Sequence, residues 1–220
     1  MPLSDAERTL LCQSAGRFDL DLRDDQVATL GDYLELLIQW RTHARLVSPR
    51  QTRADVIRKH IADAFALVKG LVACERIADV GSGAGLPGIP VAILRKDARV
   101  SLIEPNRRKA NFLREVVRRL ALPNVAVVAG RAEEVVVPEG ERFDAVVSRA
   151  VWRLAELIPR VRHLLGARGV VIAMKGPAVE QELAEIDLAA LGFQLQTLRK
   201  YSLESGESRI LVLLRPRSPA

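Results

Sequence analysis

The chain has 220 residues, 49% of them hydrophobic and 27% charged, with a formal net charge of +6 at pH 7, and these values are typical of a globular protein that can bury a sizeable core. No stretch approaches about 18 consecutive apolar residues and the first residues do not resemble a secretory signal, so we expect a cytoplasmic protein without a membrane span. The two cysteines and three histidines show no metal-binding spacing, so we expect no metal and no disulfide scaffold. We also expect a monomer, and the basic charge suits a polyanionic partner.

Apolar residues at helical spacing predict a group of helices at the N-terminus. A short helical piece surrounds Leu10 and Leu11, and longer helices are predicted over residues 24–47 and 52–69. Thr52 and Asp55 have the spacing of a capping box at the start of the last of these. Because these helices precede the first predicted strand, we expect residues 1–73 to form a helical cap. The cap would belong to the same globular unit as a domain over residues 74–220.

Residues 77–88 are predicted to form a strand, a glycine-rich turn and the start of a helix, and two ligands compete for the turn. Residues 83–88 match G-x-G-x-x-G, the pattern that holds a dinucleotide pyrophosphate at a helix N-terminus. Residues 79–83 match D-x-G-x-G, in which Asp79 brings a carboxylate to the site beside Gly81 and Gly83. A carboxylate is a poor neighbour for a phosphate and a good one for a cation. We therefore favour S-adenosyl-L-methionine over NAD as the cofactor.

From Arg76 onward, predicted strands and helices alternate. After the helix over residues 89–94, strands are predicted over residues 100–104, 125–129, 143–148 and 170–174, with helices over residues 106–120, 154–165 and 179–191. Residues 193–201 and 209–215 are predicted to pair as a hairpin across the turn at 204–207. This order predicts an α/β protein with a doubly wound, mostly parallel sheet and an antiparallel edge hairpin.

Ligands of such sheets lie outside the carboxyl ends of the parallel strands. Glu104 ends the second strand, where it could accept hydrogen bonds from both hydroxyls of a ribose. Residues 130–133 follow the third strand and offer an adenine an apolar shelf, a backbone N–H and an acid for its amine. Arg149 and Lys175 follow the fourth and fifth strands and could donate to guanine O6 or to phosphates.

The residues after the fourth strand, Ser148-Arg149-Ala150, bear on the methyl acceptor. They lack the polar-Pro-Pro-aromatic stretch that usually accompanies amine methylation, and neither cysteine is placed to attack a pyrimidine carbon. No Lys-Asp-Lys-Glu set for ribose oxygen methylation is apparent. What remains is an acceptor that is already nucleophilic, such as guanine N7, which has no proton to lose. Its methylation needs positioning, for which Arg149 and Lys175 are the candidates, rather than a general base.

The chain resembles the RsmG (GidB) family of bacterial small-subunit rRNA methyltransferases over about residues 40 to 215. The matching segments are 79–88 (DVGSGAGLPG), 102–105 (LIEP), 108–114 (RKANFLR), 130–133 (GRAE), 143–150 (FDAVVSRA) and 175–176 (KG), with 46–48 and 60–63 near the N-terminus. His60 and Asp63, one helical turn apart, are interpreted as a structural pair. The resemblance implies a class I S-adenosylmethionine-dependent methyltransferase fold and methylation of guanine N7 in 16S rRNA of the small ribosomal subunit.

The same resemblance implies roles for individual residues. Glu104 would hold the cofactor ribose, Lys175 would lie on the RNA side, and the other implied cofactor contacts are Gly81, Leu86, Ala132, Glu133 and Arg149. The family often has Asn where this chain has Arg45, and Ser where it has Ala64. Two alternatives stay open: an NAD-dependent oxidoreductase, and a non-catalytic RNA-binding protein that keeps the fold as a scaffold.

Overall fold

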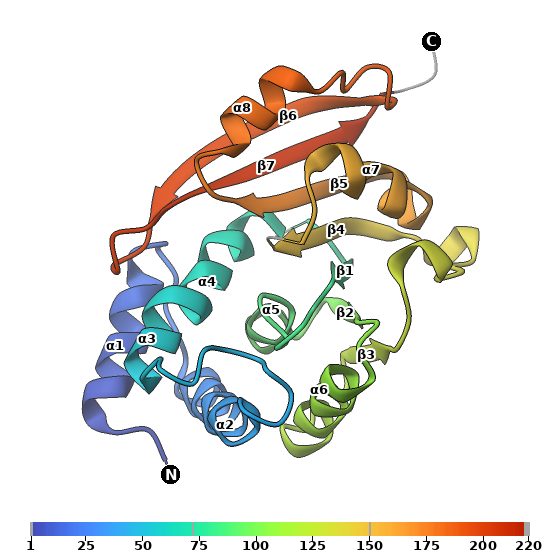
Figure 1. Cartoon of the computed structure of the whole chain (residues 1–220). Coiled ribbons are helices and arrows are strands. Elements are labelled where there is room, and N and C mark those ends of the chain that lie inside the picture. The colour runs from blue at the N-terminus through green and yellow to red at the C-terminus, as the bar shows by residue number, and fades with distance from the viewer. Residues whose placement is uncertain (1, 72, 150, 218–220) are drawn as a thin grey trace.

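A seven-stranded sheet forms the centre of the computed structural model, which describes residues 2–71, 73–149 and 151–217 (Figure 1). In order across the sheet, the strands are β3 (Val125–Val128), β2 (Arg99–Ile103), β1 (Arg76–Val80), β4 (Phe143–Arg149), β5 (Leu165–Lys175), β7 (Ser208–Pro216) and β6 (Phe193–Ser202). Strands β1 to β5 are parallel, whereas β7 pairs antiparallel with both β5 and β6. The predicted mostly parallel sheet with an antiparallel edge hairpin is confirmed.

Helices cover both faces of the sheet, because alternate residues of a strand point to opposite sides. In β1, Ile77 packs into a core shared with α1 (Asp5–Gly16), α2 (Asp24–Trp40), α5 (Gly88–Leu94) and α6 (Arg107–Arg119). Ala78 and Val80 pack into the other core, which α7 (Leu154–Val161) and α8 (Val179–Glu185) cover. The N-terminal helices therefore share a core with α5, the helix that follows the glycine-rich turn.

The helix predicted over residues 52–69 contains a π-helical turn. It consists of α3 (Arg53–Val56), the turn η1 (Ile57–Ile61) and α4 (Ala62–Val68). Thr52 caps it as predicted: its hydroxyl accepts from the Asp55 N–H at 3.1 Å, and the Asp55 carboxylate accepts from the Thr52 N–H at 2.9 Å. Such π-helical turns are rare and are frequently found at functional sites.

Several predicted boundaries are wrong. The helix predicted over residues 24–47 ends at Trp40, because the turn that follows leaves Arg45 in the left-handed region with a φ of 50°. The helix predicted over residues 179–191 ends at Glu185, because Ile186 is extended. Strand β5 begins at Leu165, where its pairing with β4 starts. The remaining short helices are η2 (Lys69–Leu71), η3 (Ala132–Glu134), η4 (Glu139–Glu141) and η5 (Arg162–Leu164).

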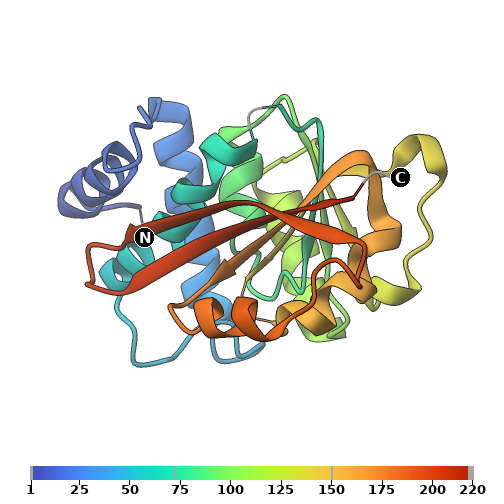
Figure 2. The same ribbon diagram turned by 90° about the horizontal axis from the view of Figure 1, so that it is seen from above.

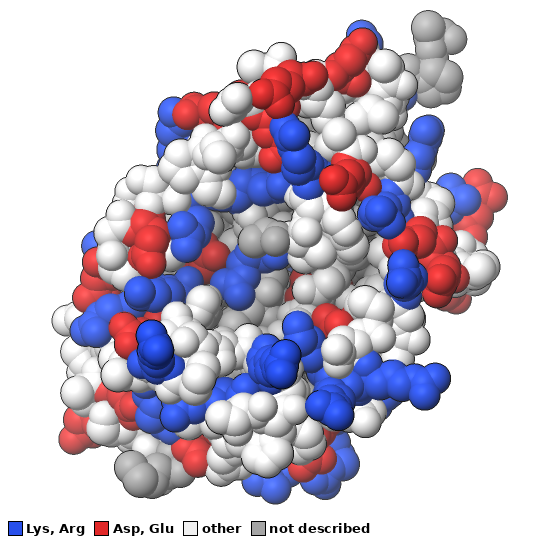
Figure 3. All heavy atoms as spheres, viewed as in Figure 1, with Lys and Arg blue, Asp and Glu red and all other residues white. Residues whose placement is uncertain are grey.

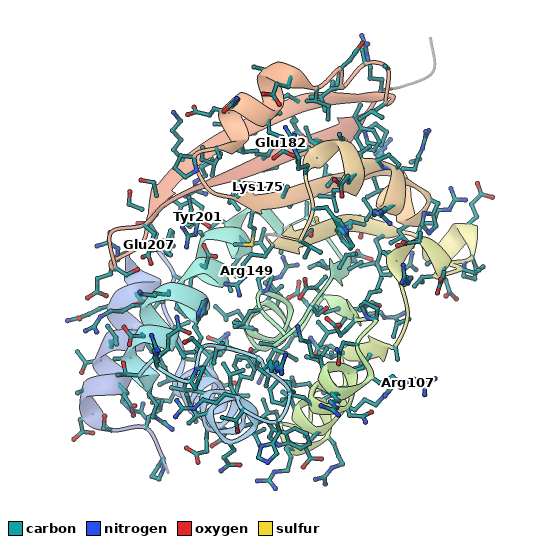
Figure 4. The ribbon with its side chains drawn as sticks, in the orientation of Figure 1. Arg107, Arg149, Lys175, Glu182, Tyr201 and Glu207 are labelled. Atoms are coloured by element: carbon teal, nitrogen blue, oxygen red, sulfur yellow. The ribbon has the colours of Figure 1, made fainter. Side chains whose placement is uncertain are left out.

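The turn end of the β6–β7 hairpin projects past the neighbouring strands and reaches the N-terminal helices (Figures 1 and 2). Ion pairs join its turn to the π-helical turn, Lys59 with Glu207 at 3.5 Å and Arg58 with Glu204 at 3.3 Å. Arg149, at the end of β4, lies beside α4 (Figure 4), 3.4 Å from the Asp63 carboxylate.

Candidate active site

The glycine-rich turn after β1 is held by contacts from the end of β2, from Glu104 that follows it, and from α2. The N–H of Gly81 donates to the Ile103 carbonyl of β2 at 2.9 Å, and the N–H of Gly83 donates to the Glu104 carboxylate at 2.8 Å. Both glycines have a positive φ, which side-chain-bearing residues rarely adopt. From α2, the buried hydroxyl of Tyr33 donates to the Ala84 carbonyl at 2.8 Å. The turn is therefore fixed in part by the N-terminal helices.

Every backbone donor in the first turn of α5 is already engaged or missing. The N–H of Gly88 donates to Asp79 Oδ2 at 2.9 Å, and the N–H of Ile89 donates to the Gly85 carbonyl at 2.7 Å. The next residue, Pro90, has no N–H. A phosphate bound at a helix N-terminus needs these donors free. The turn is thus poorly suited to the pyrophosphate of a dinucleotide.

Asp79 lies beneath the turn, with only 1% of its surface exposed. The sequence predicts that this carboxylate faces the ligand, but the alternation of β1 directs it toward α5, where it accepts from the Gly88 N–H. Burial raises its pKa to about 7, against the lowering effect of the Gly88 hydrogen bond. The carboxylate therefore joins the end of β1 to the start of α5.

A hollow of about 200 Å³ lies beside the ends of β1, β2 and β3. Its lining residues are Val80, Gly81, Ile103, Pro105, Arg131, Ala132, Glu133, Trp152 and Arg160. Gly81, Ala132 and Glu133 are the predicted cofactor residues that the fold brings together here. Trp152 and Arg160 were not predicted. The Arg160 guanidinium lies 5.5 Å from the centre of the Trp152 ring and 2.6 Å from the Glu133 carboxylate.

Glu104 and Leu86 were predicted cofactor residues that lie outside this lining. Glu104 is 5% exposed and accepts from two backbone N–H groups, those of Gly83 and Asn106, each at 2.8 Å. It therefore lies directly after β2 and against the glycine-rich turn, where the sequence predicts a ribose contact. The Leu86 side chain is buried in the core shared with α5, so that only its backbone faces the turn.

Arg149 ends β4 and meets a network that is centred on Asp63. Its guanidinium lies 3.4 Å from the Asp63 carboxylate and 3.3 Å from Nδ1 of His60. Asp63 is almost fully buried; it also accepts from the Tyr201 hydroxyl and lies 4.0 Å from Arg209, both on the hairpin. The predicted structural pair of His60 and Asp63 therefore meets at Arg149.

The charge state of His60 follows from these neighbours. Burial, followed by the positive charges of Arg149 and Arg209, lowers the pKa of His60 to about 4, so the imidazole is neutral near pH 7. Because an arginine only donates, Nδ1 of His60 accepts, and Nε2 donates to Gln51 at 3.2 Å. The network thus orients one guanidinium at the edge of the sheet.

Lys175, predicted to face RNA, is instead engaged within the protein. Its ammonium donates to the Trp152 carbonyl and lies 3.3 Å from Glu182 of α8, and both side chains are largely buried. It therefore holds the segment after β4 in place. Ala150, the last residue of the predicted Ser-Arg-Ala motif, lies outside the described residues.

Within residues 2–71, 73–149 and 151–217, no three His, Cys, Asp or Glu side chains gather as a metal ion would require. In the same ranges no helix combines the length and the apolar character needed to cross a membrane.

Comparison with known proteins identifies the family. The model of the rRNA small subunit methyltransferase G (GidB) family matches residues 26–211. A ribosomal RNA small subunit methyltransferase G of Chromobacterium violaceum is 41% identical over 174 residues, which cover 79% of this chain and 82% of that protein. Another, of Nitrosococcus oceani, is 36% identical over 201 residues, which cover 90% of each.

A crystal structure of a SAM-dependent methyltransferase from Aquifex aeolicus shares the fold, with a TM-score of 0.52 at 18% identity over 69% of this chain and 89% of that one. Because the family match and the sequence identities extend over most of its length, the chain belongs to the rRNA small subunit methyltransferase G (GidB) family.

Proposed function

We propose that this chain transfers the methyl group of S-adenosyl-L-methionine to N7 of a guanine in 16S rRNA of the small ribosomal subunit. As a member of the GidB family it is a small-subunit rRNA methyltransferase. The cofactor, the acceptor atom and the residues that act on them are the parts that we add by inference.

The hydrogen bonds in the first turn of α5 are the observation that favours S-adenosylmethionine over NAD. The donors of this turn are used by Asp79 and by the Gly85 carbonyl, so a pyrophosphate would find no free N–H there. S-adenosylmethionine has no phosphate and needs none of these donors. The same observation counts against the NAD-dependent oxidoreductase, which the comparisons do not support either.

The groups at the strand ends fit this cofactor. Each oxygen of Glu104 uses one lone pair on a backbone N–H and keeps another for a ribose hydroxyl. The apolar side chains of the hollow suit an adenine, and the Glu133 carboxylate can accept from its amine.

Guanine N7 is an acceptor that this site can serve without a base. When bound, the cofactor supplies an electrophilic methyl group on a sulfonium. The N7 lone pair would form the new N–C bond as the S–C bond of the sulfonium breaks and its electron pair passes to sulfur, and no proton would leave N7. Arg149 has donors for guanine O6 and cannot act as a base. The role of Arg149 is to position the guanine. Holding two reacting groups in the correct orientation lowers the barrier to reaction by several kcal/mol.

The surface around the site suits RNA. Figure 3 shows Lys and Arg side chains gathered in a band below the central hollow of the face seen in Figure 1. Exposed arginines of the segment after α2 and of the start of α6 are Arg45, Arg50, Arg107 and Arg108. Such charges bind phosphates independently of sequence and release counterions, so we expect RNA affinity to fall steeply with salt.

The test uses labelled S-adenosylmethionine and small ribosomal subunits from cells that lack the protein. Borohydride-aniline cleavage then locates any N7-methylguanine. We expect label at one guanine, and we expect Arg149→Gln to abolish it while calorimetry still detects a folded protein that binds the cofactor product. Arg118→Gln, on the outer surface of α6 and paired with Glu115, is the matched control and should methylate normally.

Cofactor binding without label on any RNA would favour the non-catalytic RNA-binding protein. Full activity of the Arg149 variant would show that the guanine is positioned elsewhere. Binding of NADH in place of S-adenosylmethionine would refute the proposal.

A further inference from the structure

Trp152 lies in the segment between β4 and α7, and a buried ion pair fixes its backbone. The Lys175 ammonium donates to the Trp152 carbonyl, and Glu182 binds both that ammonium and the Leu154 N–H. The Lys175 and Glu182 side chains are only 13% and 12% exposed. A charged pair buried to this extent is costly unless its geometry is well satisfied, and here each partner also bonds to the segment. The position of Trp152 is therefore set by β5 and α8.

The Trp152 side chain forms one wall of the hollow at the ends of β1, β2 and β3. Arg160 of α7 lies over the indole ring at 5.5 Å, within the range of a cation–π contact. The same guanidinium bonds to the Glu133 carboxylate at 2.6 Å. Trp152, Arg160 and Glu133 thus form a connected part of the lining of the hollow, which Gly81 also lines.

We infer that Trp152 and Arg160 form the wall against which the adenine of the cofactor packs, and that Arg160 holds Glu133 as the acceptor for the adenine amine. The inference rests on the proposed function, because it names further residues of the same cofactor site. Lys175 is then a positioning residue that acts on the cofactor through Trp152.

The arrangement gives the site a chemical preference. A carboxylate can only accept hydrogen bonds, so Glu133 suits the 6-amino group of adenine and opposes the 6-oxo group of hypoxanthine. A site built around such a bond discriminates strongly against the analogue that cannot make it. The hollow of about 200 Å³ is smaller than the pocket of a whole ligand, which is consistent with a site for one planar base.

The first experiment uses Trp152 as its own reporter. The chain has two tryptophans, and Trp40 packs against Phe112, away from the hollow. In a Trp40→Phe variant the remaining emission comes from Trp152, and we expect S-adenosylhomocysteine to change it saturably. S-inosylhomocysteine should bind at least tenfold more weakly.

Substitutions of Trp152, Arg160 and Lys175 then test the role of each residue in cofactor binding. Because stacking of a base on an aromatic ring contributes about 1–3 kcal/mol, Trp152→Ala should weaken S-adenosylhomocysteine binding by roughly 5- to 150-fold, and Trp152→Phe should restore most of it. Arg160→Ala should reduce the discrimination between the adenosyl and inosyl compounds, whereas Arg118→Ala should leave it intact. Lys175→Met should raise KM for S-adenosylmethionine and leave KM for the ribosomal subunit unchanged.

The outcomes distinguish this inference from the proposed function. If the wild-type protein does not bind S-adenosylhomocysteine in calorimetry, the proposed cofactor is wrong. If it binds, but Trp152 emission does not respond and Trp152→Ala binds as tightly as wild type, the adenine wall is refuted while the function stands. If Lys175→Met raises KM only for the subunit, Lys175 faces RNA and its role here is refuted.

Discussion

Asp79→Asn tests the buried carboxylate beneath the glycine-rich turn. Asparagine keeps an oxygen that can accept from the Gly88 N–H and removes the titrating proton. Burial raises the pKa of Asp79 from its ordinary value of 3.8 to about 7, so the folded protein holds this proton more tightly than the unfolded chain does. The corresponding stability is fully present below pH 3.8 and is lost as the pH rises through about 7. Between about pH 5 and pH 8 the loss amounts to roughly 2–3 kcal/mol.

His60 opposes this trend in the wild-type protein. Its pKa is lowered from 6.5 to about 4, so its contribution is fully present above pH 6.5 and is lost as the pH falls toward about 4. Over the same range this adds roughly 2 kcal/mol with rising pH, which nearly cancels the effect of Asp79. Only the difference between the variant and the wild type therefore isolates Asp79.

Urea unfolding of both proteins at a series of pH values and constant ionic strength measures this difference. As the pH rises from about 5 to about 8, we expect the free energy of unfolding of Asp79→Asn, relative to that of the wild type, to increase by roughly 2–3 kcal/mol. Asp97→Asn is the control: Arg95 lowers the pKa of Asp97, so that difference should not change over the range. If the Asp79→Asn difference varies by less than about 0.5 kcal/mol, the carboxyl does not change protonation on folding, and our account of its burial is refuted.

Other substitutions test neighbouring parts of the site. His60→Gln should gain stability on the wild type as the pH falls from 6.5 toward about 4, in the same urea titration. Tyr33→Phe removes the hydrogen bond to the Ala84 carbonyl, so it should lower the free energy of unfolding by about 1–3 kcal/mol and weaken cofactor binding measured by calorimetry. Unchanged binding would show that the contact from α2 does not shape the cofactor site. Gly88→Ala places a Cβ 2.3 Å from the Leu102 side chain and should lower Tm by roughly 2–12 °C, whereas Gly140→Ala, with nothing within 4 Å, should melt like the wild type.

Local sequence signals were sufficient to predict the sheet and the positions of its strand ends. The glycines at 81 and 83, the acid that ends β2 and the Gly-Arg-Ala-Glu segment after β3 lie where the alternating pattern places them. Each signal is carried by a few consecutive residues, and the parallel topology brings them to one edge. The same alternation could have shown that Asp79 shares the face of Ile77 and points away from Val80 and the hollow.

The partnerships between side chains could not be predicted in the same way. Tyr33 bonds to a carbonyl 51 residues away, and Arg160 pairs with Glu133 across 27 residues. Nothing in the composition of α2 distinguishes Tyr33 from an ordinary core aromatic, and Lys175 carries no local sign of the buried Glu182 that holds it. These contacts depend on packing between elements, which periodicity does not specify.

The bond between Asp63 and Tyr201 has a consequence for synthesis of the protein. It joins residues 138 positions apart, and Arg209, also on the hairpin, forms an ion pair with the same carboxylate. A nascent chain can form its N-terminal helices and the parallel strands while it is still being translated. The support of Arg149 is completed only after the last strands have left the ribosome. The site around Arg149 therefore reaches its final geometry only after the hairpin has emerged from the ribosome and packed against α4.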